Sequence, residues 1–324
     1  MGRTLPHVVE DCHGLLKLYS DGSVFRSKDV LMHVPSPVHD DSSVVWKDTL
    51  LDDARGLHLR IYRPRSPAPS ANALPVVFFF HGGGFCFGSR TWPNSHATCV
   101  RLCFGLRAVV LAPDYRLAPE HRLPAAADDA FRAVKWLASQ AWARGREGVL
   151  GDGVDFGRVF VVGDSSGGNL AHHLAVRLRA GSQELAPVRV RGYVMLSPFF
   201  GGTVRTKSEA EGPPEPSLNI QILDRFWRLA LPTGQNTDHP MANPFGPESP
   251  SLERVRLDPI LVMVGGKEIV KDRVENYVMK MKSLKKEVDY VVFQGEYHGF
   301  FINDPFSDVG DLVVQKIMDF MSKV

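Results

Sequence analysis

The sequence predicts an α/β fold in which a mostly parallel sheet is covered by helices on both faces. Short apolar runs that end at Gly or Pro are typical of buried parallel strands. These runs alternate with stretches of helical spacing, which is the pattern of repeated β–α units. The chain has 324 residues, a length that suits one α/β domain. We therefore expect residues 1–324 to form a single domain.

The expected strands and helices follow in order from these patterns. The run at 76–80 is wholly apolar and stops at glycines, and the run at 108–112 stops at Pro113. Further strand-like runs lie at 159–162, 190–196, 260–264 and 288–293. Helical stretches lie between or after them, at 124–139, 170–178, 274–284 and 312–321. Sites in such sheets form beyond the carboxyl ends of the strands, so the residues directly after each run are the most informative.

Two regions break the alternation. Residues 1–45 precede the first clear core strand, and residues 201–250 are rich in Pro and Gly with an apolar, helix-like piece at 220–231. A long insertion between sheet elements is often a lid over the site. We expect both regions to form a cap, with an ordinary surface excursion as the alternative.

Composition excludes several classes of partner. Lys and Arg number 38 and Asp and Glu 36, a net charge of +2, whereas a nucleic-acid binder needs a basic excess. No apolar run approaches the roughly 18 residues of a membrane span, and residues 1–14 lack the apolar core of a signal peptide. The four cysteines show no metal-binding spacing and are expected to be reduced, buried thiols. We expect no nucleic-acid or membrane partner, and a cytoplasmic location with the nucleus as a second possibility.

The nucleophile candidate is Ser165. The stretch Gly163-Asp164-Ser165-Ser166-Gly167 follows a predicted strand and opens a predicted helix, which is the context that G-x-S-x-G requires. Glycines two positions before and after the serine let strand and helix approach closely. Ser166 lacks this spacing because Asp164 stands two positions before it. The alternative is a glycine-rich helix start with a purely structural role.

An oxyanion-binding loop is predicted after the strand at 76–80. His81-Gly82-Gly83-Gly84-Phe85 exposes consecutive backbone N–H groups that can face the oxygen on which negative charge develops during acyl transfer. The HGGG pattern acts with the N–H of the residue after the nucleophile, here Ser166. The alternatives are a flexible loop and a phosphate-binding loop, but the G-x-x-x-x-G-K-[ST] pattern of the latter is absent.

The general base candidate is His298. A Ser–acid–His order along the chain leaves four histidines after Ser165, namely His172, His173, His239 and His298. The first two lie on the helix that leaves the serine, and His239 lies in the expected cap. His298 follows the last strand-like run, in a loop at the correct edge of the sheet, where an imidazole can take and return the serine proton.

Two carboxylates after the strand at 260–264 could orient His298. Asp272 and Glu275 resemble a capping box for the following helix, which gives Asp272 a structural role. Glu268 lies directly after the strand, nearer the catalytic edge. We assign Glu268 as the acid that holds the imidazole, with Asp272 as the alternative and Asp164 as a more distant one.

These motifs together resemble the plant carboxylesterases of the hormone-sensitive-lipase group of α/β-hydrolases. The resemblance covers nearly the whole chain and is carried by four stretches, HGGGF at 81–85, DYRLAPEH at 114–121, GDSSGGN at 163–169 and HGF at 298–300. It implies that Gly83 and Gly84 supply oxyanion donors and that cap elements come from the N-terminus and a mid-chain insertion. Most members carry Ala where this chain has Ser166, a change of little consequence because the backbone N–H is the working group.

The resemblance also implies an activity. It points to ester hydrolysis through an acyl-enzyme, with a small-molecule ester as substrate, no metal or organic cofactor, and a monomer or homodimer. Most members carry Asp at the acid position, and Glu268 resembles the subgroup that hydrolyses strigolactones, which are butenolide hormones. The residues themselves offer candidate walls of an apolar acyl or alcohol pocket, with a place in the core as the alternative for most of them: Phe85, Phe87, Phe199, Phe226, Trp227, Phe300 and Phe301.

Two other functions on this scaffold stay open. Gibberellin receptors of the family lack the catalytic histidine, whereas His298 is present here. Its dehydratases tend to carry Thr at the nucleophile position, where this chain has Ser165.

Overall fold

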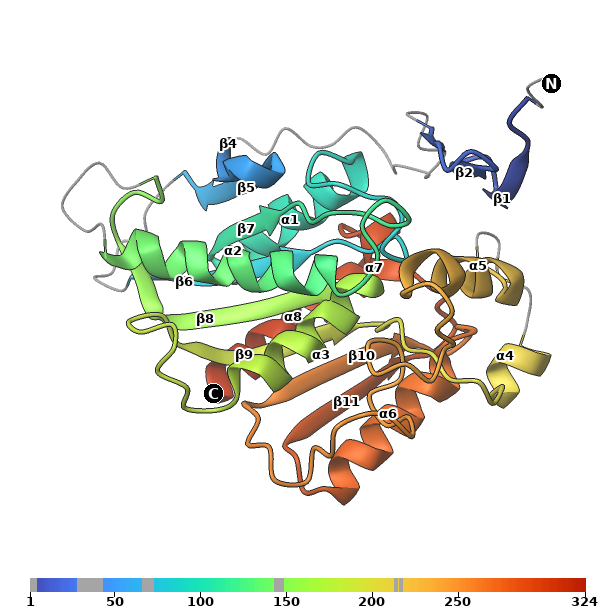
Figure 1. The fold of residues 1–324 in the computed structure, drawn as a ribbon. Coiled ribbons are helices and arrows are strands. Elements are labelled where there is room, and N and C mark those ends of the chain that lie inside the picture. The colour runs from blue at the N-terminus through green and yellow to red at the C-terminus, as the bar shows by residue number, and fades with distance from the viewer. Residues whose placement is uncertain (1–4, 28–42, 66–72, 143–148, 213–214, 216–217) are drawn as a thin grey trace.

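The computed structural model describes residues 5–27, 43–65, 73–142, 149–212, 215 and 218–324. Its centre is an eight-stranded sheet (Figure 1). The strands are β4 (Val44–Asp52), β5 (Leu57–Pro64), β6 (Leu74–Phe80), β7 (Val109–Pro113), β8 (Val154–Asp164), β9 (Val190–Leu196), β10 (Ile260–Gly265) and β11 (Val288–Phe293). Their order is β11-β10-β9-β8-β6-β7-β5-β4. The six strands from β11 to β7 are parallel, and β5 and β4 extend the sheet as antiparallel strands.

Helices cover both faces of this sheet, as the sequence predicts (Figure 1). One face carries α2 (Ala125–Trp142), α3 (Ser166–Leu178) and α6 (Lys271–Ser283). The other carries α1 (Pro93–Leu106), α7 (Phe300–Asn303) and α8 (Asp308–Lys323). The α/β fold expected from the β–α alternation is confirmed.

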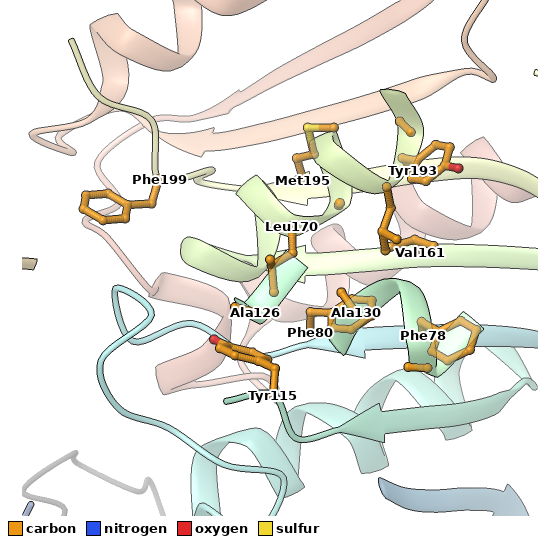
Figure 2. Close-up of a cluster of buried hydrophobic side chains, with 14 of the residues drawn as sticks. Phe78, Phe80, Tyr115, Ala126, Ala130, Val161, Leu170, Tyr193, Met195 and Phe199 are labelled. Carbon is orange, nitrogen blue, oxygen red and sulfur yellow. The ribbon is translucent and has the colours of Figure 1, made fainter. Parts of the chain in front are cut away.

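Burial on both faces explains why the central strands are apolar without interruption. Along β6, Phe78 and Phe80 point to the core under α2 and α3, whereas Val77 and Phe79 point to the core under α1 and α8. Figure 2 shows Phe78 and Phe80 opposite Ala130 of α2, whose short side chain leaves room for the rings. Each fully buried Phe contributes about 1.5–3 kcal/mol through the apolar surface it removes from water.

A second, small sheet precedes the main one. It consists of β1 (Val8–Cys12), β2 (Leu16–Tyr19) and β3 (Val24–Arg26), all antiparallel. The sequence patterns did not predict these strands, nor β4, β5 or α1.

The two regions expected to form a cap contain this small sheet and two helices, α4 (Lys207–Glu211) and α5 (Ile220–Ala230). Residues 28–42, 213–214 and 216–217 of these regions lie outside the described residues. Figure 1 shows α5 beside β1. Arg228 forms two hydrogen bonds with Glu10, at 2.8 and 3.0 Å, and Arg225 donates to the Asp11 carbonyl at 2.6 Å. The N-terminal sheet and the mid-chain insertion are thus bound to each other.

Arg26 of β3 ties the small sheet to the main domain. Its guanidinium donates to the carbonyl oxygens of Cys86 and Ala118, at 2.8 and 2.7 Å, and pairs with the Glu120 carboxylate. These partners lie in or near the glycine-rich loop after β6.

Within the described residues, no helix combines the length and apolarity that crossing a bilayer requires.

Candidate active site

Ser165 lies on a sharp turn between β8 and α3. Its φ of 52° and ψ of −113° fall in a sparsely populated region that costs about 1–3 kcal/mol. A Cβ on Gly163 would lie 2.0 Å from the Gly167 carbonyl oxygen, and a Cβ on Gly167 would lie 2.0 Å from the Phe80 carbonyl oxygen. The two glycines therefore permit an elbow that presents the serine hydroxyl at the carboxyl edge of the sheet.

His298, in the loop after β11, contacts this serine. Its Nε2 lies 3.0 Å from Ser165 Oγ, and its Nδ1 lies 2.8 Å from Glu268 Oε2. A carboxylate only accepts hydrogen bonds, so Nδ1 carries the proton and Nε2 is free to accept the serine hydroxyl. This arrangement can draw a proton from Ser165.

Glu268 is 1% exposed and lies just after β10. Its Oε1 accepts the Ser197 hydroxyl and the Gly265 N–H, both at 2.5 Å. With Oε1 occupied by two donors, Oε2 faces the imidazole of His298. These hydrogen bonds fix the carboxylate in place. They also offset the free-energy cost of burying its charge, because hydrogen bonds to an ionised oxygen are strong.

Asp272 lies elsewhere. Its carboxylate accepts the backbone N–H of Ser208 in α4 at 2.7 Å. The prediction that Asp272 caps the helix that follows it is wrong, because α6 starts earlier, at Lys271. Its N-cap residue is Val270, which makes no side-chain cap bond. Asp272 instead satisfies a free N–H in the first turn of α4, where a negative charge is favourable.

Three carboxyl groups surround the imidazole. Burial of His298 disfavours its charged form, but the negative charges of Glu268, Asp164 and Glu215 favour it, and together they raise the pKa of the imidazole. Burial raises the pKa of Asp164 to about 7. The same negative charges stabilise the imidazolium that forms when the neutral imidazole takes the serine proton.

The glycine-rich loop lies directly against the elbow. A Cβ on Gly82 would be 2.5 Å from Asp164 Oδ2 and 3.2 Å from Ser165 Cβ. Gly83 and Gly84 have φ of 110° and 58°, and in the described part of the chain neither N–H donates a hydrogen bond. Ser166 is the first residue of α3, where backbone N–H groups point out of the helix. These groups can bind an anionic oxygen next to Ser165.

Neighbouring residues hold this loop in shape. Tyr115 donates its hydroxyl to the His81 carbonyl at 2.9 Å and stacks on the His81 ring, with ring centroids 4.3 Å apart. Ala118 donates its N–H to the Phe85 carbonyl at 2.9 Å. The motif at 114–121 thus supports the oxyanion loop from behind.

The predicted substrate-contacting aromatics lie in two places. Phe85, 1% exposed, packs against Phe199 and Trp227, and Phe87 packs against Phe226 of α5. Phe300 packs against Phe293, next to the core under α1 and α8. Phe85 and Phe87 therefore anchor the oxyanion loop to α5, and contact with a substrate stays a prediction for every candidate.

The sequence analysis missed two residues of the site, Ser197 and Glu215. Ser197 follows β9 directly, so the rule that residues after each strand are informative could have found it. Glu215 has no such signal, because it reaches the His298 backbone N–H from the insertion, at 3.0 Å. Among the described residues, no group of three His, Cys, Asp or Glu side chains is placed to hold a metal.

A serine elbow at the carboxyl edge of such a sheet is characteristic of the α/β hydrolases. Comparison with known proteins agrees, because the α/β hydrolase fold family matches residues 77–302. Carboxylesterase 20 of Arabidopsis thaliana is 35% identical over 93% of this chain and 94% of its own length. The gibberellin receptor GID1C of the same plant is 33% identical over 86% of this chain and 82% of its own.

A solved structure supports the same class. An esterase of Pyrobaculum calidifontis superimposes with a TM-score of 0.72 at 30% identity, covering 89% of this chain and 86% of that one. The chain belongs to the α/β hydrolase fold family, and within it to the group of the plant carboxylesterases.

Proposed function

We propose that this protein is a carboxylic ester hydrolase that cleaves esters of small apolar molecules through an acyl-enzyme. The observation that carries the proposal is the chain of contacts from Ser165 Oγ to His298 Nε2 at 3.0 Å and from His298 Nδ1 to Glu268 Oε2 at 2.8 Å. Family membership supports it, since named carboxylesterases are among the relatives. No cofactor takes part in the proposed reaction.

In the first half-reaction, Ser165 attacks the ester carbonyl carbon while His298 takes the hydroxyl proton. Negative charge moves to the carbonyl oxygen, which the N–H groups of Gly83, Gly84 and Ser166 bind. Glu268 stabilises the imidazolium and holds its orientation. The imidazolium then protonates the leaving alcohol, and the acyl group stays on the serine.

In the second half-reaction, His298 removes a proton from water, which attacks the acyl carbonyl. The same N–H groups bind the second oxyanion. Collapse of this intermediate returns the proton to Ser165 and releases the carboxylic acid.

For the substrate, we propose a butenolide hormone of the strigolactone type. A glutamate as the acid, Glu268, is the feature that sets this subgroup apart from most of the family. The rings of Phe87 and Phe226, packed at 5.4 Å between centroids beside the oxyanion loop, give the region an apolar character that suits such a ligand.

The relationship to a gibberellin receptor makes non-catalytic hormone binding the second candidate. It is the weaker one, because His298 contacts both Ser165 and Glu268. A dehydratase on this scaffold is also less well supported, because the nucleophile position holds Ser165 rather than Thr.

The test is Ser165→Ala, with purified wild type as the control. We expect wild type to hydrolyse a short p-nitrophenyl ester and the variant to lose this turnover with an unchanged circular dichroism spectrum. Undiminished turnover in the variant would exclude Ser165 as nucleophile.

A competition among aryl esters, butenolide hormones and simple lactones, read by mass spectrometry, ranks the substrates. A ligand that binds with a measurable Kd and is never cleaved would favour the receptor.

The organisation of the protein is part of the proposal. Residues 1–324 form one domain, with cap elements from 1–45 and 201–250 over the site. The protein acts as a monomer or homodimer in the cytoplasm, with the nucleus as a second location that imaging of a tagged protein tests. Light scattering after size-exclusion chromatography distinguishes the two assemblies.

A further inference from the structure

Glu215 joins the two loops that carry the base and the acid. It comes from the chain between α4 and α5, far from its partners in sequence. Its Oε2 accepts the backbone N–H of His298 at 3.0 Å, and its Oε1 accepts the backbone N–H of Ile269, the residue directly after Glu268. A single carboxylate in the mid-chain insertion is therefore bonded to the main chain at both partners of the triad.

Ile269 is held by this insertion from two sides. Its N–H donates to Glu215, and its carbonyl accepts the hydroxyl of Ser208 in α4 at 2.8 Å. Ser208 also donates its N–H to the Asp272 carboxylate. These directed contacts fix the backbone next to Glu268 relative to the insertion.

The two loops have other connections that do not involve Glu215. Lys267 donates its N–H to the Glu296 carbonyl at 2.9 Å, and Gly266 donates to the Phe293 carbonyl at 2.8 Å. The loops therefore stay together without Glu215. Its added effect is on the exact position of the imidazole, where a shift of about 1 Å can cost about 100-fold in rate.

Glu215 also contributes charge. The charged groups around the imidazole are Glu268, Asp164 and Glu215, and each of them favours protonated His298. Glu215 itself is partly buried, which raises its own pKa, while its bonds to the N–H groups of Ile269 and His298 act in the opposite direction. Two N–H donors would lose their acceptor if the carboxylate were removed.

We propose that Glu215 is a positioning residue of the esterase, through which the insertion holds the imidazole in line with the serine. The backbone bonds set the position of His298 relative to Glu268, and the negative charge supports the imidazolium of each half-reaction. This inference rests on the proposed ester hydrolysis and adds to it that the mid-chain insertion helps to set the geometry of the triad.

The test compares Glu215→Gln and Glu215→Asp with Glu211→Gln, which changes an exposed carboxylate in the same insertion. An amide of equal shape loses the charge and can accept at only one end. We expect Glu215→Gln to lower kcat for p-nitrophenyl acetate by about tenfold or more, with KM within about twofold because Glu215 contacts main chain. Glu211→Gln should match wild type.

The second readout is the titration of His298 itself, followed by NMR of the imidazole. Loss of a nearby negative charge lowers the pKa of an imidazole, so the midpoint in Glu215→Gln should move to lower pH. The acid limb of kcat/KM should move in the same direction. Glu215→Asp keeps the charge but is too short to reach both N–H groups, so its His298 midpoint should stay near wild type while kcat falls.

Wild-type kcat together with a wild-type His298 midpoint in Glu215→Gln would overturn the proposal. If Glu215→Gln does not fold, a wild-type kcat in Glu215→Asp would overturn the proposal instead. If wild type cleaves no ester at all, the proposed function fails, and the NMR titration still decides whether Glu215 acts on His298.

Discussion

Replacing Glu268 with glutamine tests the acid of the site most directly, because the structure dictates how the amide will orient. Oε1 accepts two donors, the Ser197 hydroxyl and the Gly265 N–H. In Glu268→Gln the amide oxygen must occupy that position, so the NH₂ group turns to Nδ1 of His298. Nδ1 must then accept, and the imidazole proton moves to Nε2.

That tautomer cannot take a proton from Ser165, whose hydroxyl lies 3.0 Å from Nε2. Where an amide replaces the acid of a triad, kcat falls by about 10⁴. At about 1.36 kcal/mol per factor of ten, this is about 5.4 kcal/mol of lost transition-state stabilisation. The volume of the side chain is unchanged, so folding should be preserved.

The assay is steady-state hydrolysis of p-nitrophenyl acetate, with Asp272→Asn as the matched control. Asp272 binds a backbone N–H of α4 rather than the imidazole. The amide oxygen of asparagine can still accept that N–H, so the variant should keep kcat within about threefold of wild type. A crippled Asp272→Asn beside an active, folded Glu268→Gln would refute the reasoning.

Three more outcomes are expected. Ser197→Ala removes a hydrogen bond to charged Glu268, so the free energy of unfolding in urea should fall by about 1.5–3 kcal/mol. An unchanged urea midpoint would contradict this expectation. Gly84→Ala places a Cβ 2.6 Å from the Phe226 ring at a φ of 58°. The oxyanion loop must then shift, and kcat should drop by about 100-fold or more; a wild-type kcat would contradict this. Burial raises the pKa of Asp164 from 3.8 to about 7, so folding favours its protonated form and stability is lost as pH rises from about 4 through 7. Asp164→Asn does not titrate, and its Tm relative to wild type should therefore be higher at pH 8 than at pH 4; a constant difference would contradict this.

The central strands and the triad candidates could be predicted because both follow from one rule of parallel sheets. A strand buried on both faces must be apolar throughout, as β6 is, and polar side chains directly after such strands meet at one edge. Ser165, Glu268 and His298 all occupy such positions. Their pairwise contacts could not be predicted, since these depend on how the loops turn.

The antiparallel strands were missed for a physical reason. β5 contains Arg60, which is buried but paired with Asp48 of β4 at 2.8 and 2.9 Å. A search for apolar runs passes over a strand whose buried charge is neutralised by its neighbour. Most of β4 is exposed, so it has no apolar run either.

Glu215 marks the limit of the sequence analysis. Its two hydrogen bonds depend on an insertion folding back over loops that lie some fifty and eighty positions further along the chain. Neither periodicity nor a motif reports such a long-range contact.

The small N-terminal sheet has a practical consequence for anyone who shortens this protein. Removing the first 27 residues would strip Arg225 and Arg228 of their partners and leave the carbonyl oxygens of Cys86 and Ala118 without the guanidinium of Arg26. A shortened protein, made for expression or crystallisation, would thus be altered beside the candidate active site and not at a distant terminus. Fusion tags are better placed after Val324, because Figure 1 shows that end on the opposite side of the molecule from β1 and α5.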